Sequence, residues 1–554
     1  MVKTLKDPYG MKGALSMAVI ETDVIIIGAG PAGLMAANVL QKRGVDFVCL
    51  EKKPGRSVLS KALGIQARSL ELFEFLGVNK PFVKRGYPGP GAKIHLAGKK
   101  PSYVEMYHVK SRYPYLLIIP QHEIEEILET HLNDRGGVIS REHEVLNVVQ
   151  EQEGVYVTAS HNGETKQYLA KYVLACDGAH SKVRQLLDVE FVGEDEGITF
   201  FTGDVEIPEM KEIHINLHIN DRGAAAFFPY KDGSYRVVGF DRTRQKGPRR
   251  KEMKLQELQT SLDTILTTSY QVEKPRWLGY FGTAHRQVPN YREDRVFFVG
   301  DAAHINNPLG GQGMNIGLED VANLCWKIDT VLKGYAGSPF LDTYHEERAP
   351  VAKEVIRNTT LELKMIQLKG FPGKVRNWAG KAALTQNWVQ AIFAKALSHV
   401  HNDYDKTPIN RSFKDKSLPR RAIQAGERVP DQLLFMNGTT DERLFPLIQR
   451  LGYVCLIYID SYQPDLVDFA YAFAEKANEA FPDMIKVFLV ARGGTVLTER
   501  NELPIIYDSY RHLDRNLGMR KGSMLFIRPD GHVGFHDGSA DLKKVMGKLK
   551  RYFI

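Results

Sequence analysis

The sequence predicts an α/β fold made of more than one domain, and three stretches of the chain carry this prediction. An apolar run, Val24 to Ile27, leads into spaced glycines and a helix-forming stretch, which is a strand–turn–helix pattern. Between residues 190 and 290, apolar and polar residues alternate in runs separated by turn residues, as in antiparallel sheets. Beyond residue 431, strand and helix patterns alternate again in the order β-α-β-α-β-β-α.

The composition is that of a globular enzyme. The chain has 554 residues, of which 43% are hydrophobic and 25% charged, enough for several domains with their own cores. The net charge is +8, and no block of like charges suggests a nucleic-acid-binding tail. No apolar run is long enough to span a membrane, and residues 1–16 lack a secretory signal pattern. We therefore expect no nucleic-acid partner and no membrane partner, and we interpret residues 1–16 as a disordered extension or as the product of an upstream start.

The cysteines indicate a reducing compartment. Cys49, Cys176, Cys325 and Cys455 are far apart in the chain, and the first three lie in apolar or motif segments. This pattern is typical of buried free thiols and not of a disulfide framework. We therefore predict a cytoplasmic location and no metal site.

The N-terminal stretch has the features of a dinucleotide-binding motif. Gly28, Gly30 and Gly33 have the GxGxxG spacing after a short apolar strand, and the next strand ends at Glu51. The first glycine permits a tight turn, the second lets a pyrophosphate approach the backbone, and the third allows close helix–strand packing. The helix N-terminus offers N–H groups to the phosphates, and the acid can accept ribose hydroxyls. This segment alone predicts a dinucleotide site without saying which dinucleotide binds.

Two later segments repeat the order of strand, turn and helix. Asp177-Gly178 follows an apolar strand and precedes a helix with basic residues in its first turns. Gly300-Asp301 follows the apolar run 295–299 and precedes a glycine-rich helix start. This placement would put Asp301 beside a polyol hydroxyl and direct helix N–H groups at a ring that carries negative charge. The plainer interpretation is that Asp301 caps the helix that follows it.

Together these three segments resemble the class A flavoprotein monooxygenases, the family of p-hydroxybenzoate hydroxylase and phenol hydroxylase. In that family the GxGxxG motif and the acid bind the ADP half of FAD. The DG segment touches FAD and NADPH, and the GD segment holds the ribityl chain. The runs ERAPVAKEV, AGERVPD and FIRPDG are similar to those of phenol hydroxylase-like members that carry a C-terminal thioredoxin-like domain.

The resemblance implies an FAD-dependent monooxygenase that hydroxylates a phenolic or polyketide-type aromatic substrate. NADPH (or NADH) would be the co-substrate that reduces FAD, and O2 would form a flavin C4a-hydroperoxide that attacks the ring. Two related alternatives stay open: a flavin oxidoreductase of the same superfamily that inserts no oxygen, and a monooxygenase that modifies a rifamycin-like antibiotic. A non-catalytic flavin-binding partner is a further hypothesis, which the completeness of the motifs disfavours.

The resemblance also implies FAD contacts from all three motifs and their surroundings, at Gly28, Gly30, Pro31, Ala32, Gly33, Glu51, Lys52, Lys61, Gln121, Val145, Asp177, Asp301, Pro308, Gly311, Gly313, Met314 and Asn315. Lys61 stands where the family usually has arginine, so the charge is kept but the planar fork of donors is lost. Leu63 stands where phenol hydroxylases place an aspartate base. The sequence therefore identifies no catalytic base.

Several polar residues near the motifs have plainer explanations than catalysis. His180 and His304 lie inside the motifs, where a histidine more often forms a structural hydrogen bond or packs. Tyr230, Tyr280 and Arg286 lie in or near the predicted substrate sheet, and core or surface roles are more typical of such residues.

The predicted domain organisation follows from these assignments. A Rossmann-type FAD-binding domain of the p-hydroxybenzoate hydroxylase type would span 17–401, with an antiparallel substrate-binding sheet inserted at about 86–120 and 190–290. The polar stretch 402–430 is interpreted as a linker, and 431–554 as a thioredoxin-like domain. The redox form of that domain needs a CxxC motif, which is absent, so we expect a structural role or a contact in a homodimer.

Overall fold

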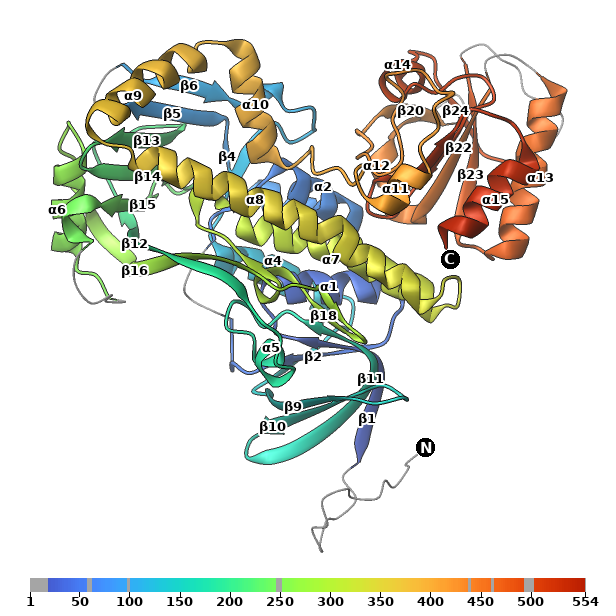
Figure 1. Cartoon of the computed structure of the whole chain (residues 1–554), viewed down its shortest axis with the longest axis horizontal. Helices are drawn as coiled ribbons and strands as arrows, with labels where there is room; N and C mark the ends of the chain where they lie inside the picture. The colour runs from blue at the N-terminus through green and yellow to red at the C-terminus, as the bar shows by residue number, and fades with distance from the viewer. Residues whose placement is uncertain are drawn as a thin grey trace, which may run out of the picture.

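The structure, a computed structural model, describes residues 18–56, 62–96, 100–245, 252–436, 440–459, 463–492 and 503–553. The extension predicted at residues 1–16 and the predicted flavin contact Lys61 lie outside these described residues. Figure 1 shows an N-terminal α/β region, a second sheet beside it and a C-terminal α/β domain on the opposite side of the long helix α8 (Thr343–Gln367).

The first sheet carries the three glycine-containing motifs at the ends of neighbouring strands. Its order is β17-β18-β11-β1-β2-β8, with β10 beside β11 and β9 beside β10. Strands β18, β11, β1 and β2 run parallel, so their carboxyl ends lie at one edge of the sheet. The strands are β1 (Val19–Ile27), β2 (Phe47–Glu51), β8 (Ile139–Arg141), β9 (Glu144–Gln150), β10 (Val155–His161), β11 (Glu164–Ala175), β17 (Arg292–Glu293) and β18 (Val296–Phe298).

The second sheet is the one that the alternating runs predict. Its order is β19-β16-β12-β15-β14-β13-β5-β6, and its pairs are antiparallel except for β13 with β5, which are parallel. Helix α6 (Leu255–Ile265) packs on one face of this sheet. The strands are β5 (Gly91–Leu96), β6 (Ser102–Glu105), β12 (Val192–Glu206), β13 (Ile215–Asn220), β14 (Gly223–Pro229), β15 (Tyr235–Asp241), β16 (Glu273–Gln287) and β19 (His304–Ile305).

A small sheet of order β3-β7-β4 and several helices complete the N-terminal part of the chain. The strands are β3 (Gly64–Ile65), β4 (Tyr87–Gly89) and β7 (Leu116–Ile118). The helices are α1 (Pro31–Arg43), α2 (Ala67–Leu76), α3 (Asn79–Arg85), α4 (Gln121–Asn133), α5 (Lys182–Leu186), α7 (Gly313–Leu332), α9 (Gly370–Leu384) and α10 (Asn387–Ser398). Short 3-10 turns are η1 (Met106–His108), η2 (Arg242–Arg244), η3 (Gly300–Ala302), η4 (Leu309–Gly311) and η5 (Ser338–Asp342).

The segment 402–430, interpreted as a linker because it is polar and lacks periodicity, is in large part packed against the rest of the protein. It contains helix α11 (Pro408–Ser412), and Tyr404, Phe413 and Val429 in it are buried. These side chains are buried by contacts with distant parts of the chain, and such contacts leave no periodic pattern in the local sequence.

The C-terminal domain is a mixed sheet of order β21-β20-β24-β23-β22-β25-β26 with helices on it. The strand and helix order predicted from Tyr453 onward is present, together with additional elements that the sequence patterns did not predict. The strands are β20 (Leu433–Met436), β21 (Thr440–Arg443), β22 (Tyr453–Ile459), β23 (Ile485–Ala491), β24 (Ile505–Tyr507), β25 (Met524–Ile527) and β26 (Val533–Asp537). The helices are α12 (Leu444–Leu451), α13 (Pro464–Ala480), α14 (His512–Leu517) and α15 (Leu542–Tyr552).

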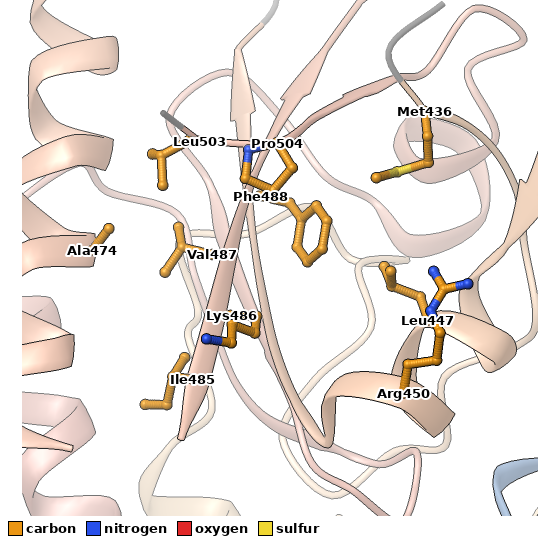
Figure 2. A pocket seen from close by; sticks show the side chains of 10 residues that line it. All are labelled: Met436, Leu447, Arg450, Ala474, Ile485, Lys486, Val487, Phe488, Leu503 and Pro504. Carbon is orange, nitrogen blue, oxygen red and sulfur yellow. The ribbon is translucent and has the colours of Figure 1, made fainter. Parts of the chain in front are cut away.

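A surface pocket of about 380 Å³ lies in this C-terminal domain. Figure 2 shows that β23, α12 and α13 supply most of its lining, which is largely apolar, with Arg450 and Lys486 as its charged side chains. None of the predicted cofactor residues lines it. The pocket is therefore separate from the site that the three motifs form.

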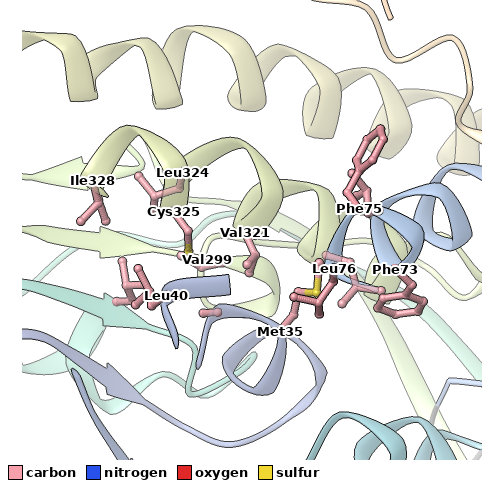
Figure 3. Packing of buried hydrophobic residues seen from close by; sticks show 14 of the residues in the cluster. Met35, Leu40, Phe73, Phe75, Leu76, Val299, Val321, Leu324, Cys325 and Ile328 are labelled. Atoms are coloured by element: carbon pink, nitrogen blue, oxygen red, sulfur yellow. The ribbon is translucent and has the colours of Figure 1, made fainter. Parts of the chain in front are cut away.

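The largest hydrophobic core lies under the first motif. Strand β1 is fully buried from Val24 to Ile26, which explains why its sequence is continuously apolar instead of alternating. Figure 3 shows Leu40 of α1 and Leu324 and Ile328 of α7 among the buried side chains of this core. The core thereby fixes helix α1, which follows GxGxxG, against helix α7, which follows the GD segment.

A buried ionic cluster joins the C-terminal domain to the N-terminal part of the chain. We call Lys327, Glu347, Arg528 and Asp530 the interdomain ionic cluster; each side chain is at most 2% exposed. Glu347 accepts two hydrogen bonds from Arg528, at 2.7 and 2.9 Å, and one from Lys327 at 2.8 Å. Because the partners come from α7, α8 and the turn after β25, the cluster connects the two domains.

Acid is expected to destabilise the protein through the buried carboxylate of Glu319. Burial alone would raise the pKa of Glu319, but His399 and Arg348 beside it lower that pKa to about 2. Between about pH 4.5 and about pH 2 the unfolded chain therefore binds more protons than the folded protein. Above about pH 4.5 the protonation of Glu319 should not change the free energy of unfolding. Between about pH 4.5 and about pH 2 the free energy of unfolding should fall by roughly 2–3 kcal/mol.

Urea denaturation midpoints at neutral pH and at a series of acidic pH values measure this effect. A midpoint that stays constant or rises on acidification would contradict the assignment of Glu319 as a native carboxylate. The exposed residue Glu354, in a weak pair with Arg357, offers a matched control, since Glu354→Gln should leave the pH profile unchanged.

Candidate functional site

The three motifs meet because they follow three adjacent parallel strands. Ile27, the last residue of β1, pairs with Ala175 at the end of β11, which in turn pairs with Phe298 at the end of β18. Gly28, Cys176-Asp177 and Val299-Gly300 follow these strand ends directly. Segments far apart in the sequence are therefore brought to one edge of the sheet, which is where open α/β sheets bind ligands.

The glycines of the first motif divide into two that pack closely and one that faces open space. Gly28 has φ of +101°, and a Cβ atom added to it would lie 2.5 Å from the carbonyl oxygen of Cys176. A Cβ atom on Gly33 would lie 1.8 Å from the carbonyl oxygen of Gly28. By contrast, a Cβ atom on Gly30 would meet nothing within 4 Å. Gly30 therefore borders a space that a phosphate group could occupy, as the sequence predicts for its position.

The N-terminus of α1 can bind an anion. Helix α1 begins at Pro31 after Gly30, no side chain caps it, and its first turn contains no acidic residue. Its unpaired N–H groups and its dipole therefore face the space beside Gly30 with partial positive charge. The Glu51 carboxylate is held next to this turn, because it accepts hydrogen bonds from the backbone N–H groups of Ala29 at 2.8 Å and Lys53 at 2.9 Å. Lys52 is exposed.

Asp177 in the DG segment has one occupied and one unoccupied acceptor oxygen. Its Oδ2 atom accepts hydrogen bonds from the backbone N–H groups of Lys182 at 2.6 Å and Val183 at 3.1 Å. Its Oδ1 atom is buried and has no hydrogen-bond partner among the described residues. Burial raises the pKa of Asp177. A buried acceptor without a partner is costly, so this atom suits a donor on a bound ligand.

Arg184 connects the DG segment to the GD segment. Its guanidinium donates to the carbonyl oxygen of Ala302 at 2.9 Å and to that of Ala179 at 2.7 Å. The side chain is buried and lies over the ring of Phe191, with its Cζ atom 3.8 Å from the ring centroid. In the sequence, Arg184 is only one of the basic residues near a helix start. Its double carbonyl contact could not be inferred from the local pattern.

The GD turn packs directly against both helices that surround the site. Gly300 has φ of +61°, and a Cβ atom added there would lie 3.4 Å from the Ala32 Cβ and 3.5 Å from the Gly317 Cα. Asp301 is exposed. The turn therefore joins α1 and α7, and it places Asp301 toward the edge where the motifs meet.

Two residues that sequence reasoning did not select hold this turn from behind. Asp320 accepts hydrogen bonds from the Gly300 N–H at 3.1 Å and from Arg348 Nε at 2.8 Å, and its Oδ2 lies 2.7 Å from His304 Nε2. His304 is thus a buried hydrogen-bonding residue, in agreement with its plainer interpretation. The only sequence signal for Asp320 is a charged residue within a helix that is otherwise largely buried. Arg348 lies in α8, where fewer than half of the residues are buried, so it has no such signal.

The start of α7 is positioned by the side chain of Asn315. Asn315 donates to the carbonyl oxygens of Gly64 and Gly311, both at 2.9 Å, and its Oδ1 accepts from the Gln66 N–H at 2.9 Å. The side chain is fully buried and committed to these contacts. A cofactor contact at Asn315 would therefore come from its backbone N–H. Gly313 and Met314, in the same first turn, are partly exposed.

The remaining predicted contacts lie at the borders of the same region. Gln121 starts α4 and accepts a hydrogen bond from the Ala62 N–H at 3.0 Å. Val145 is buried in β9, two residues after His143, whose N–H donates to the Glu51 carbonyl at 3.0 Å. Pro308 and Gly311 are partly or fully exposed in the loop that precedes α7.

The other polar residues with plainer explanations than catalysis are exposed, ion-paired or packed in the structure. His180 is exposed. Tyr230 is buried and donates to Asp204 at 3.1 Å, and Arg286 pairs with Asp195 at 3.2 Å. Tyr280 packs on the side of the second sheet that faces α6.

Taken together, these residues fit a flavin dinucleotide. The fit rests on the open space beside Gly30, the uncapped start of α1 and the buried unpartnered oxygen of Asp177. Within the described ranges, no group of three or more acidic, histidine or cysteine side chains is arranged to hold a metal ion. Among the helices that the structure describes, none is both long and apolar enough to cross a bilayer.

Comparison with known proteins gives the same result. Residues 21–359, more than half of the chain, match the family described as the FAD binding domain. The chain is 30% identical over 535 residues to the uncharacterized aromatic compound monooxygenase YhjG of Bacillus subtilis, covering 96% of this chain and 98% of that protein. It is 37% identical over 390 residues to a rifampicin monooxygenase of Streptomyces venezuelae, covering 69% and 79% of the two chains.

A solved structure extends the similarity to nearly the whole fold. The anhydrotetracycline hydroxylase OxyS of Streptomyces rimosus superimposes with a TM-score of 0.74 at 26% identity, covering 96% of this chain and 99% of that one. These matches confirm the predicted family and its cofactor, FAD. The chain belongs to the FAD binding domain family, within the class A FAD-dependent aromatic monooxygenases.

Proposed function

We propose that this protein hydroxylates a phenolic or polyketide-type aromatic compound, with NADPH or NADH as the electron donor and O2 as the oxygen source. The names of its relatives support this substrate class, since they act on aromatic compounds, rifampicin and anhydrotetracycline. The observation that carries the proposal is an apolar surface of the second sheet that meets the loop in front of α7.

We call this surface the apolar wall. It is formed by side chains of three neighbouring strands, of β16 and of the turn η4: Leu217, Phe228, Val238, Phe281 and Leu309. Leu217 and Val238 lie on the same face because both pair with Ala226 of the strand between them. All five side chains are only partly buried, although they belong to hydrophobic clusters. An apolar surface that is not sealed by packing suits an aromatic ligand.

Two apolar clusters of the domain meet at the wall. One cluster contains Leu309 of η4 and Leu363 of α8, and the other contains Leu63 and Tyr230. Val238 is partly buried and packs against both clusters. Leu309 comes from the turn that directly precedes α7, at whose N-terminus the flavin contacts are predicted. The wall therefore runs from the substrate sheet to the predicted flavin site.

The chain's own residues supply positioning and electrostatics in this scheme. FAD, when bound, carries electrons from the nicotinamide co-substrate to oxygen. The N-terminus of α7 would stabilise negative charge on the ring system, and the apolar wall would exclude water from it. Gly28, Gly30, Ala32, Glu51, Asp177 and Asp301 are the residues that we propose hold the dinucleotide and its ribityl chain.

No carboxylate stands at the position of the phenol hydroxylase base. Leu63 is 9% exposed and packs against Ile118 and Tyr230 in an apolar cluster. A substrate whose ring is already activated, or one that loses its proton to solvent, therefore fits this site better than a phenol that needs a base at this position.

Enlarging the wall should block the substrate and leave the flavin in place. Val238→Trp introduces a large ring among side chains of the apolar wall, so kcat/KM for an aromatic substrate should fall by about tenfold or more. The flavin content of the purified protein should not change. Val138, which is 72% exposed and outside the wall, gives the matched control Val138→Trp, which should behave like the wild type. An unchanged kcat/KM in Val238→Trp would contradict the location of the substrate.

The proposed activity is tested by measuring NADPH oxidation in the presence of a panel of aromatic compounds. The expected result is a faster rate with one class of phenol or polyketide aromatic and a hydroxylated product by mass spectrometry. Faster NADPH oxidation with no oxygenated product from any compound would instead identify an oxidoreductase that inserts no oxygen.

We infer a thioredoxin-like topology without redox chemistry for the C-terminal domain. The order of β22, α13, β23, α14, β25, β26 and α15 supports this topology. Its only cysteine, Cys455, lies in the interior strand β22, and burial raises the pKa of this thiol well above its usual value. Such a thiol is unreactive, so a structural role fits the domain better than disulfide exchange.

A further inference from the structure

Helices α9 and α10 present their apolar side chains to solvent. Phe371, Val375 and Trp378 follow at spacings of four and three residues, which places them on one face of α9. Phe371 is 78% exposed and Trp378 is 74% exposed. Trp388 and Ile392, one turn apart on α10, are 67% and 56% exposed. We call the exposed faces of these two helices the α9–α10 surface.

The exposure is not a consequence of loosely placed helices. On the opposite face of α9, Gly373, Asn377 and Leu384 are buried, and Val389 and Ala394 are buried in α10. Both helices lie against the edge strand β6 of the second sheet, and Figure 1 shows them at the outer rim of the molecule, away from the C-terminal domain. Each helix thus has one face on the protein and a second apolar face that points outward.

Within the chain segment that carries these apolar residues, the acidic and basic side chains are all of one sign. From Leu363 to Asn402 the sequence contains no aspartate or glutamate, although the chain as a whole has 66 acidic residues among 554. The same stretch contains six lysine and arginine residues. The lysines that are exposed there are Lys364, Lys369, Lys374, Lys381 and Lys395.

The exposed aromatic side chains and the exposed lysines together favour one class of partner. A second copy of the chain, related by a two-fold axis, would bring the same lysines together at the contact, which is repulsive. An anionic surface would be attracted by the lysines and would also accept the aromatic side chains. Exposed tryptophan and phenylalanine together with exposed lysines on the same helices are typical of helices that lie in the interface of a membrane, where long lysine side chains keep their charge in the headgroup layer.

We propose that the α9–α10 surface binds the interface of an anionic lipid bilayer. The two helices would lie in the plane of the membrane, with the aromatic side chains at the boundary of headgroups and acyl chains and the lysines at the anionic headgroups. This association needs no spanning segment. It departs from the expectation of no membrane partner, which rested on the absence of such a segment in the sequence. The membrane contact would involve this surface alone, whichever substrate the enzyme uses.

Flotation of the full-length, FAD-loaded protein with vesicles tests the proposal. We expect binding to vesicles of phosphatidylcholine mixed with phosphatidylglycerol, weaker binding to phosphatidylcholine alone, and release as salt is raised. Tryptophan emission should shift to the blue on binding, since Trp378 and Trp388 are two of the four tryptophans and the most exposed. No binding to the anionic vesicles, or equal binding to both kinds, would overturn the proposal.

Two pairs of substitutions locate the contact. Trp378→Ser with Trp388→Ser, and separately Lys374→Glu with Lys381→Glu, should each lower the partition coefficient for anionic vesicles by about tenfold or more. The matched controls lie in the C-terminal domain, where Tyr510→Ser removes an exposed aromatic residue and Lys521→Glu with Lys550→Glu makes the same change of charge. The controls should bind like the wild type.

Two further outcomes would also reject the proposal. If the control variants lose binding as strongly as the surface variants, the attraction comes from overall charge and not from this surface. If the protein forms a dimer without vesicles and the tryptophan variant is monomeric in analytical ultracentrifugation, the surface is a contact between copies of the chain.

Discussion

Gly30→Val is expected to abolish most of the FAD affinity while leaving the protein folded. Gly30 has φ of −77° and ψ of −175°, an extended conformation that valine adopts readily, and a Cβ atom there meets no protein atom within 4 Å. The added methyl groups would occupy the space that the pyrophosphate needs. We expect the Kd for FAD to rise at least about 100-fold, or roughly 2.7 kcal/mol, as measured by flavin fluorescence titration. The thermal unfolding midpoint of the apoprotein should stay close to that of the wild type.

Gly33→Ala provides the contrast. Its Cβ atom would lie 1.8 Å from the Gly28 carbonyl oxygen, so this variant should lose stability as well as FAD affinity. Gly547→Ala, on helix α15 where nothing lies within 4 Å, should alter neither. A Gly30→Val protein that binds FAD as tightly as the wild type would contradict the location of the pyrophosphate at this turn.

Breaking the interdomain ionic cluster is expected to cause the largest loss of stability. Glu347 receives five hydrogen bonds, which come from Arg528 twice and from Lys327, Asn323 and Asn410 once each. Glu347→Gln would leave Arg528 and Lys327 buried with less compensating charge. Removing one partner of a buried pair typically costs about 3–5 kcal/mol, so the urea midpoint should fall markedly.

The exposed carboxylate Glu354 lies in the same helix α8, seven residues further on, and gives the matched control. Glu354→Gln should change the free energy of unfolding by no more than about 0.5 kcal/mol, because Glu354 is 61% exposed on its side chain and its contact with Arg357 is 3.8 Å long. If Glu347→Gln and Glu354→Gln have equal effects, the cluster does not hold the two domains together.

The sequence predicted the parts of the site that depend on local backbone geometry. An added Cβ atom would collide with a carbonyl oxygen at Gly28 and at Gly33, and Gly300 has a positive φ. Such positions require glycine, so they are visible in the sequence. The order of these motifs carries the resemblance to the family, and that resemblance implied the cofactor. The order of elements in the C-terminal domain from β22 onward could also be predicted, because apolar residues recur at different spacings in its buried strands and in its amphipathic helices.

The contacts that fix the site were not predictable, because they join residues far apart in the chain. Arg184 reaches Ala302, and Arg348 reaches Asp320 behind the GD turn, and neither pair has a local signature. The segment 402–430 was misleading for the same reason. Its Tyr404 lies under Arg348, 3.1 Å from hydroxyl to guanidinium, although the surrounding sequence is polar and aperiodic.

The most direct test of the proposed activity is whether the purified protein transfers an oxygen atom from O2 to an aromatic ring. The reaction should be run with FAD, NADPH and heavy-isotope oxygen, using an aromatic compound that accelerates NADPH oxidation. We expect a product whose mass carries one heavy oxygen atom, and we expect Gly30→Val to form no such product. A protein that binds no FAD, or a product that contains no labelled oxygen while NADPH is consumed, would contradict the proposed activity.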